Sequence, residues 1–216
     1  MNKDEPLHLI MPRGCTFGWG VCGKYLALEL SKFKALRYVC EPFGEEDIGD
    51  RRQFEILSGL WRSKDFYKKS GPKEGEVVLD GAAIQAIEGQ SLKPIMMNVR
   101  SPLKIGYTFF ETPFLRSDDV ARANDYYDMV VGGSTWCRNI LAENGVKNTG
   151  SIMQGIDTDL FNTDPAEKDL FKDRFVVFSG GKFELRKGQD LVIRAFKVLQ
   201  DRHDDVVLVN CWYNQW

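Results

Sequence analysis

The chain has 216 residues, of which 43% are hydrophobic and 28% are charged, so it can form a folded core and does not have the composition of a disordered protein. The formal net charge of −2 provides no basic field of the kind that recruits nucleic acid, and a nucleic-acid partner is not expected. The polar, acidic N-terminus and the lack of any run of about 18 apolar residues predict neither a signal peptide nor a transmembrane segment.

In chain order, the first part of the sequence alternates apolar runs with amphipathic segments. The pattern predicts a strand at 7–11, a glycine-rich loop at 12–20, a helix with an apolar face at 21–33, a strand at 37–41 and a helix at 53–61. The alternation of strand and helix starts here and continues through most of the chain.

The next part repeats the alternation. It predicts a strand at 76–79, a short helix at 82–87, a strand at 105–111, a helix at 117–127, a strand at 129–131, a helix at 136–143 and a strand at 151–154. Ser117 and Ser134 are the predicted N-caps of two of these helices, because a serine side chain can accept a hydrogen bond from the first turn. Asn144 and Gly145 are typical of a helix C-terminus.

Strands that alternate with helices indicate a parallel sheet covered on both faces, so residues 1–164 are predicted to form a Rossmann-like α/β domain. Residues 157–168, rich in Asp, Asn, Thr and Pro, are typical of a linker. A strand–turn–helix–strand unit follows, with its first strand at 175–178, its helix at 190–200 and its second strand at 206–211. Residues 165–216 are therefore expected to be the start of a second Rossmann-like domain that is truncated, and its exposed sheet edge is expected to favour self-association.

The turn between the strand at 175–178 and the helix at 190–200 carries three cations. Lys182 and Lys187 bracket it, Arg186 lies beside Lys187, and Gly188 allows the backbone to tighten as the helix begins. A helix N-terminus with fixed cations suits a phosphate or a diphosphate. The alternative is a solvated basic turn, which is common where a strand joins a helix.

Gly18, Gly20 and Gly23 match the letters of a G-x-G-x-x-G dinucleotide fingerprint, and Glu41 stands where the ribose-binding acid is expected. This pattern keeps an NAD-dependent oxidoreductase open as an alternative. Trp19, between the first two glycines, is bulky for a pyrophosphate cradle.

Glu111 is predicted at the carboxyl end of the strand at 105–111, where open α/β sheets bind their ligands. The loop that continues with Thr112 would point this carboxylate outward, where it could bind an acceptor hydroxyl or support a developing oxocarbenium ion. The alternative is a carboxylate that caps a helix or forms an ion pair. Trp19 and Trp136 could line a sugar-binding cleft or pack in the core.

The cysteines and histidines bear on compartment and on metal binding. Five cysteines, without a C-x-x-C pair, accompany only two histidines. Free thiols in a reducing compartment are therefore predicted, which favours a cytoplasmic protein without a metal site. The five are Cys15, Cys22, Cys40, Cys137 and Cys211.

Four segments, in this order, resemble the retaining glycosyltransferases of family 4, which have the GT-B fold. They are 18–26 (the family's glycine loop and first helix), 134–146 (a serine and aromatic residue, a helix and Gly-Val), 154–161 (the passage between domains) and 181–188 (the turn that grips the donor diphosphate). The likeness covers the family's N-terminal domain and the beginning of its C-terminal one.

The resemblance implies transfer of a sugar from a UDP- or GDP-sugar to a glycan, lipid or protein acceptor, with retention and with no cofactor or metal. It implies a donor-phosphate site made by the turn cations and the amides of the glycine loop, and a catalytic Glu111. Residues that would line the cleft or the acceptor site are Trp19, Thr112, Trp136 and Asp157; those at the donor phosphate are Lys182, Lys187, Arg186, Gly20 and Gly18.

The sequence departs from the family at two places. Lys182 replaces the usual arginine, so bidentate phosphate binding is lost at that position. The family's Glu-x7-Glu passage, which holds the sugar and ribose, has no counterpart, and Glu41-Pro42-Phe43-Gly44 imitates its start by coincidence. A non-catalytic truncated homologue that binds an acceptor or partner through its first domain is therefore a second hypothesis.

Overall fold

The computed structural model describes residues 5–63, 65, 76–163 and 170–213. The chain divides into two compact units, unit 1 (Met1–Ile156) and unit 2 (Asp157–Trp216). The division lies at the start of the predicted linker, whereas the sequence placed the boundary after residue 164. Residues 164–168 of that linker lie outside the described residues.

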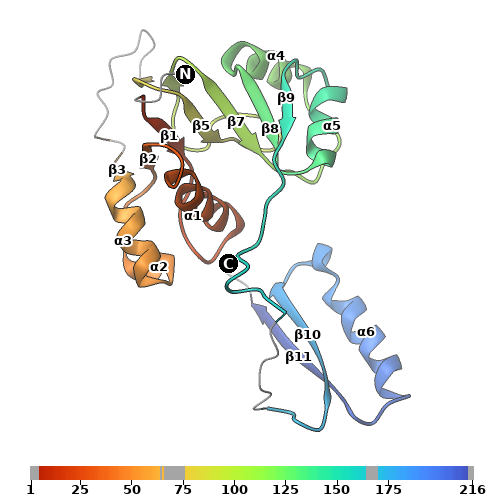
Figure 1. Ribbon diagram of the computed structural model, residues 1–216. Helices are drawn as coiled ribbons and strands as arrows, with labels where there is room; N and C mark the ends of the chain where they lie inside the picture. The colour runs from red at the N-terminus through yellow and green to blue at the C-terminus, as the bar shows by residue number, and fades with distance from the viewer. Residues whose placement is uncertain (1–4, 64, 66–75, 164–169, 214–216) are drawn as a thin grey trace. The chain divides into compact units, whose positions relative to one another are not determined.

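Unit 1 is built around a seven-stranded parallel sheet in the order β3-β2-β1-β5-β7-β8-β9, with helices on both faces, which is a Rossmann-like α/β architecture (Figure 1). Strands β4 (Val77–Val78) and β6 (Val99–Arg100) form a separate parallel pair. The strands of the large sheet are β1 (Leu7–Ile10), β2 (Leu36–Val39), β3 (Trp61–Arg62), β5 (Ala83–Ala86), β7 (Lys104–Thr108), β8 (Met129–Gly132) and β9 (Thr149–Ser151).

Alternate residues of the central strands face opposite sides of the sheet, because the side-chain period of a strand is two. Leu9 and Tyr38 pack in a cluster with the apolar side chains of α1 and α3. Ile10 and Val39 belong to another cluster, with residues of β4 and β6. Both faces of β1 and β2 are thus covered. The helices of unit 1 are α1 (Gly18–Ser31), α2 (Glu45–Ile48), α3 (Arg51–Leu60), α4 (Ser117–Tyr126) and α5 (Thr135–Glu143).

The predicted short helix at 82–87 is wrong. Residues Ala83–Ala86 form β5, a central strand that pairs in parallel with β1 and β7. Alanine has the highest helix propensity, but propensity is a weak signal over four residues. Ala83 and Ala86 are buried, and their small side chains fit a strand that has a neighbour on each side.

Further boundaries differ from the sequence prediction, and the strand predicted at 151–154 lies instead at Thr149–Ser151 (β9). Strand β7 ends at Thr108, so Glu111 lies beyond the strand and not at its end. The N-cap of α4 is Arg116 and no side chain caps it, while Ser117 is the first helical residue. The predicted loop at 12–20 is shorter, because α1 begins at Gly18. The Ser134 cap is confirmed: its hydroxyl accepts a hydrogen bond from the Cys137 amide at 3.1 Å.

Unit 2 is a strand–helix–strand crossover. β10 (Phe175–Lys182) and β11 (Val206–Tyr213) are parallel partners, and a 3-10 turn (Leu185–Lys187) and α6 (Gln189–Gln200) connect them (Figure 1). The predicted strand at 175–178 is therefore too short. Gly180 and Gly181 suggested a turn, but both pair with β11.

Unit 2 exposes several large apolar side chains, and Leu185 is 92% exposed. Self-association through this unit stays a prediction. Among the described residues, no helix is long and apolar enough to cross a bilayer. The exposed apolar side chains of β10, the turn and α6 are Phe175, Phe178, Phe183, Leu185, Leu191, Ile193 and Val198.

Candidate functional site

The carboxyl edge of the unit 1 sheet has a switch point between β1 and β5. The chain moves from β1 to β2 and β3 on one side, and later to β5, β7, β8 and β9 on the other. Loops that follow strands on the two sides of such a point diverge, and ligands of open α/β sheets bind in the crevice between them.

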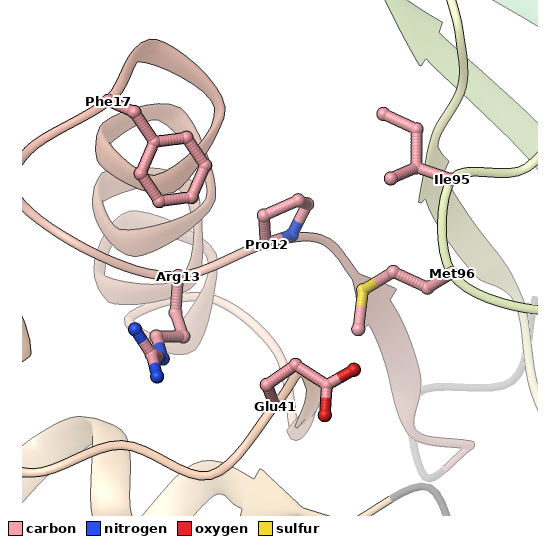
Figure 2. Close-up of a pocket in the computed structure, with 6 residues that line it drawn as sticks. All are labelled: Pro12, Arg13, Phe17, Glu41, Ile95 and Met96. Atoms are coloured by element: carbon pink, nitrogen blue, oxygen red, sulfur yellow. The ribbon is translucent and has the colours of Figure 1, made fainter. Parts of the chain in front are cut away.

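A pocket of about 290 Å³ lies at this switch point (Figure 2). The segment after β1 contributes Pro12 and Arg13, and the segment after β2 contributes Glu41. These positions follow directly from the parallel sheet, because both strands end at the same edge. Among the described residues, the lining is Pro12, Arg13, Phe17, Glu41, Ile95 and Met96.

The guanidinium of Arg13 joins the segments that follow β1 and β2. Its Nη1 donates to Asp47 Oδ1 at 2.8 Å and its Nη2 donates to the Pro42 carbonyl at 2.6 Å. Asp47 also accepts from the Gly44 amide at 2.9 Å. Arg13 therefore fixes the shape of one pocket wall, and its charge is balanced by Asp47.

Glu41 supplies a carboxylate on another wall of the pocket, away from the Arg13 guanidinium (Figure 2). The remaining lining is apolar: Figure 2 shows Ile95 and Met96 on the side opposite Arg13, Pro12 between the two sides and Phe17 on the side of Arg13. An apolar wall with one carboxylate suits a hydroxyl-bearing molecule that has an apolar face. The sequence patterns did not predict this pocket.

The three glycines of the fingerprint letters have different surroundings. A Cβ on Gly20 would lie 2.7 Å from the Arg13 carbonyl, and one on Gly23 would lie 2.1 Å from the Pro12 carbonyl. Gly18 has no heavy atom within 4 Å of such a Cβ. Gly20 and Gly23 therefore allow α1 to approach the segment after β1.

The same geometry bears on the dinucleotide alternative. Residues 11–17 separate the end of β1 from Gly18, whereas the dinucleotide fingerprint begins immediately after its strand. Gly18 and Gly20 lie in the first turn of α1, where backbone amides lack intrahelical acceptors. Their amides could meet an anion, but the fingerprint turn itself is absent.

Trp19 packs against residues at the end of β7 and just after it. Its ring stacks on Phe109 with centroids 4.0 Å apart, and it meets Tyr107 edge-on at 6.4 Å. Trp19 belongs to the partly buried shell of the core cluster under α1. This favours the packing interpretation that the sequence left open.

Glu111, Thr112 and Trp136 lie at the carboxyl edge of β7 and β8, away from the pocket lining. Glu111 is exposed, and the hydroxyl of Thr112 is buried without a hydrogen-bond partner. Trp136, in the first turn of α5, is 44% exposed and packs against Phe110 with centroids 5.8 Å apart. The structure thus places Glu111 and Thr112 on the segment after β7 and Trp136 at the start of α5, outside the described lining of the switch-point pocket.

In unit 2, Asp157 organises a local turn. Its Oδ1 accepts from the amides of Asp159 at 3.1 Å and Leu160 at 3.3 Å. Such a bond pattern is typical of aspartate at the start of a turn. These two hydrogen bonds therefore stabilise the local turn.

The predicted cationic turn forms between β10 and α6. Lys182 ends the strand, Arg186 and Lys187 lie in the 3-10 turn, and Gly188 has a φ of +68°. This left-handed conformation favours glycine, and Gly188 is the N-cap of α6. The turn therefore presents three cations beside the first turn of a twelve-residue helix.

Glu184 lies within this turn and pairs with two of the cations. Its Oε1 is 3.4 Å from Lys182 Nζ, and its Oε2 is 2.9 Å from Arg186 Nε. Desolvation raises the pKa of Glu184, but the hydrogen bond from Lys182 and the charges of Arg186, Lys182 and Lys187 together bring its pKa below the usual value. The sequence motif did not point to Glu184 as a member of the site.

Gln189 connects the start of α6 to the end of β10. Its side chain is buried, and its Nε2 donates to the Lys182 carbonyl at 2.6 Å. This bond fixes the position of Lys182 relative to the helix N-terminus. Gln189 is a second contributor to the turn that the spacing of cations could not reveal.

The five cysteines are free thiols, as predicted. Within the described ranges, no group of three or more His, Cys, Asp or Glu side chains is arranged to hold a metal ion.

No protein-family model and no curated protein matches the sequence. Among solved structures, the chain is similar to Anabaena HepE, which was crystallised in complex with UDP and glucose, with a TM-score of 0.53 and 12% identity. The alignment covers 95% of this chain and 60% of HepE, so the chain spans less than two thirds of that protein's length. At this identity the likeness is one of fold.

Proposed function

We propose that the chain is a glycosyltransferase that moves a sugar from a UDP- or GDP-sugar to a glycan, lipid or protein acceptor. Retention of the anomeric configuration and membership of family 4 are part of this proposal, and the four sequence segments support them. The fold shared with HepE, a protein crystallised with UDP and glucose, supports a nucleotide-sugar ligand.

The observation that carries the proposal is the cationic turn of unit 2. Lys182, Arg186 and Lys187 stand beside the N-terminus of α6, where the backbone amides of the first helical turn are also available. A leaving diphosphate develops negative charge, and cations with oriented amides stabilise such charge. These features support the turn as the site of the donor diphosphate.

Unit 1 would supply the acceptor side. The pocket at the switch point carries the Glu41 carboxylate and an apolar wall, and Glu111 stands exposed on a loop at the same edge of the sheet. We propose Glu111 as the carboxylate that supports the reacting sugar, with Thr112 and Trp136 beside it. The amides of Gly18 and Gly20 are proposed to assist at the donor phosphate.

A binding module without catalysis is the second candidate. The specific observation in its favour is that all the described residues that line the switch-point pocket belong to unit 1. A module would bind glycans without releasing UDP from a UDP-sugar. A transferase would release UDP when donor and acceptor are both supplied.

We predict that nucleotide-diphosphate binding needs no divalent cation, because the proposed phosphate site contains lysine and arginine side chains whose charge would serve in place of a metal. Calorimetric titration with UDP should give the same dissociation constant in EDTA and in manganese. Affinity that disappears in EDTA and returns with manganese would overturn both metal independence and the direct role of the turn cations.

A further inference from the structure

The cationic turn contains its own anion. The turn cluster, defined here as Lys182, Glu184, Arg186 and Lys187, has three positive charges and one negative charge, a net of +2. The two Glu184 oxygens approach different cations, one facing Lys182 and the other facing Arg186. A carboxylate that bridges two cations in this way occupies the space that two oxygens of a phosphate group would need.

Neither contact has the length and alignment of a strong ion pair: the Lys182 contact is long, and the Arg186 contact, though short, is not well aligned. Charge-assisted N–H···O bonds are about 2.7–2.9 Å long, and the distance from Lys182 Nζ to Oε1 is 3.4 Å. Oε2 is 2.9 Å from Arg186 Nε, yet it is a buried oxygen without a well-aligned hydrogen bond. A ligand oxygen with better alignment could therefore take the place of the carboxylate.

The backbone around Glu184 is held while its side chain has room to leave. The Gln189 bond to the Lys182 carbonyl, the Gly188 cap and the strand pairing of Lys182 with Tyr213 fix the turn on both sides. The Glu184 side chain is 27% exposed, so rotation toward solvent is open to it. A change of side-chain rotamer would then suffice to open the cation pair.

We propose that Glu184 is an internal stand-in for phosphate, which holds Lys182 and Arg186 together in the unliganded protein and is displaced when the diphosphate binds. The inference rests on the proposed function of the turn. Displacing the carboxylate costs free energy, and this cost weakens the binding of every anion. Only a ligand with several negative oxygens gains enough from the cations and the α6 amides to offset the cost. Glu184 would thus select diphosphates over singly charged anions.

The test is the affinity of the full 216-residue chain for inorganic pyrophosphate, measured by calorimetry for the wild type and for Glu184→Gln. The glutamine keeps the size of the side chain and removes its charge, so the variant should bind pyrophosphate about two- to fivefold more tightly, the range expected for a partly exposed charge. Asp201→Asn, at the far end of α6, makes the same change in net charge and should bind as the wild type does.

Each outcome has a distinct consequence. Wild-type binding with equal or weaker binding by Glu184→Gln would overturn the stand-in role and leave the proposed function standing. Binding by neither protein would overturn both. Binding by Glu184→Gln alone would support the stand-in role strongly, because the carboxylate would then be the obstacle.

A second measurement does not depend on a variant. In the wild type, the side-chain carboxyl ¹³C resonance of Glu184 should shift as pyrophosphate saturates the site, because the carboxylate leaves both cations. A resonance that stays unchanged at saturation would contradict displacement.

Discussion

Replacing Lys187 by alanine is expected to weaken UDP binding by about 10- to 100-fold, the range for loss of one charge-assisted contact to a phosphate. Lys187 is exposed and lies in the 3-10 turn, and within the described part of the chain its side chain makes no hydrogen bond or ion pair. The substitution should therefore leave the stability of the fold nearly unchanged. Calorimetric titration of UDP and GDP measures the loss directly.

Lys197→Ala is the matched control for this prediction, because Lys197 is an exposed lysine in the last turn of α6, the helix that follows the cationic turn. It removes one positive charge from unit 2 at the end of α6 that is far from the turn. Its UDP affinity should equal that of the wild type. Equal affinities for wild type and Lys187→Ala would remove Lys187 from the proposed donor site.

Lys182→Ala is expected to weaken UDP binding as well. The same change also removes one of the two cations that the Glu184 carboxylate contacts, so its effect on affinity is less direct than that of Lys187→Ala.

The largest expected effect on stability is that of Gly23→Ala, with a loss of about 3 kcal/mol in the free energy of unfolding. Alanine at a solvent-facing helical glycine normally stabilises by about 0.5–1 kcal/mol. At Gly23, however, the new Cβ would lie 2.1 Å from the Pro12 carbonyl and 3.1 Å from the Met11 Cβ. Backbone cannot yield as a side chain can, so α1 would have to move away from β1.

Gly59→Ala provides the comparison, since Gly59 is in α3 and a Cβ added there would have no heavy atom within 4 Å. It should follow the ordinary rule and stabilise the protein. The free energy of unfolding in urea is measured for the two variants and the wild type. We expect it to rise for Gly59→Ala and to fall for Gly23→Ala. Stabilisation by Gly23→Ala would show that α1 does not pack closely against the segment after β1.

The α/β class and much of the element order could be predicted, because buried parallel strands are continuous apolar runs and amphipathic helices have a clear period. Local signals with a defined chemistry were also reliable. Ser134 caps α5 through its hydroxyl, Gly145 has a φ of +92° beyond the same helix, and Gly188 turns the chain into α6. In each case a single residue type satisfies a backbone requirement.

Two of the errors have a common cause, which is that partners distant in the sequence override local preference. Ala83 and Ala86 favour a helix locally, but their pairing with β1 and β7 makes them a strand. Gly180 and Gly181 favour a turn locally, but β11 extends the ladder through them. The sequence contains no local sign of either pairing.

The candidate site, like the fold, could be predicted only in part from the sequence. The three cations of the turn are close in sequence, so their grouping could be predicted from spacing alone. The pairing of Glu184 with two of these cations could not be predicted, because the contacts of Glu184 depend on the path of the turn. The switch-point pocket draws on segments after β1 and β2 and on residues 95–96, and only the strand order brings them together.

The most direct test of the central claim is to locate the UDP site by amide ¹H–¹⁵N chemical shifts, with UDP titrated into the full chain. The account predicts that the largest shifts fall at residues 181–191, which include the end of β10, the cationic turn and the first turn of α6. The same titration with uridine, which lacks phosphates, should shift these amides far less. Saturable UDP binding that leaves residues 181–191 unchanged would contradict the claim that this turn holds the donor diphosphate.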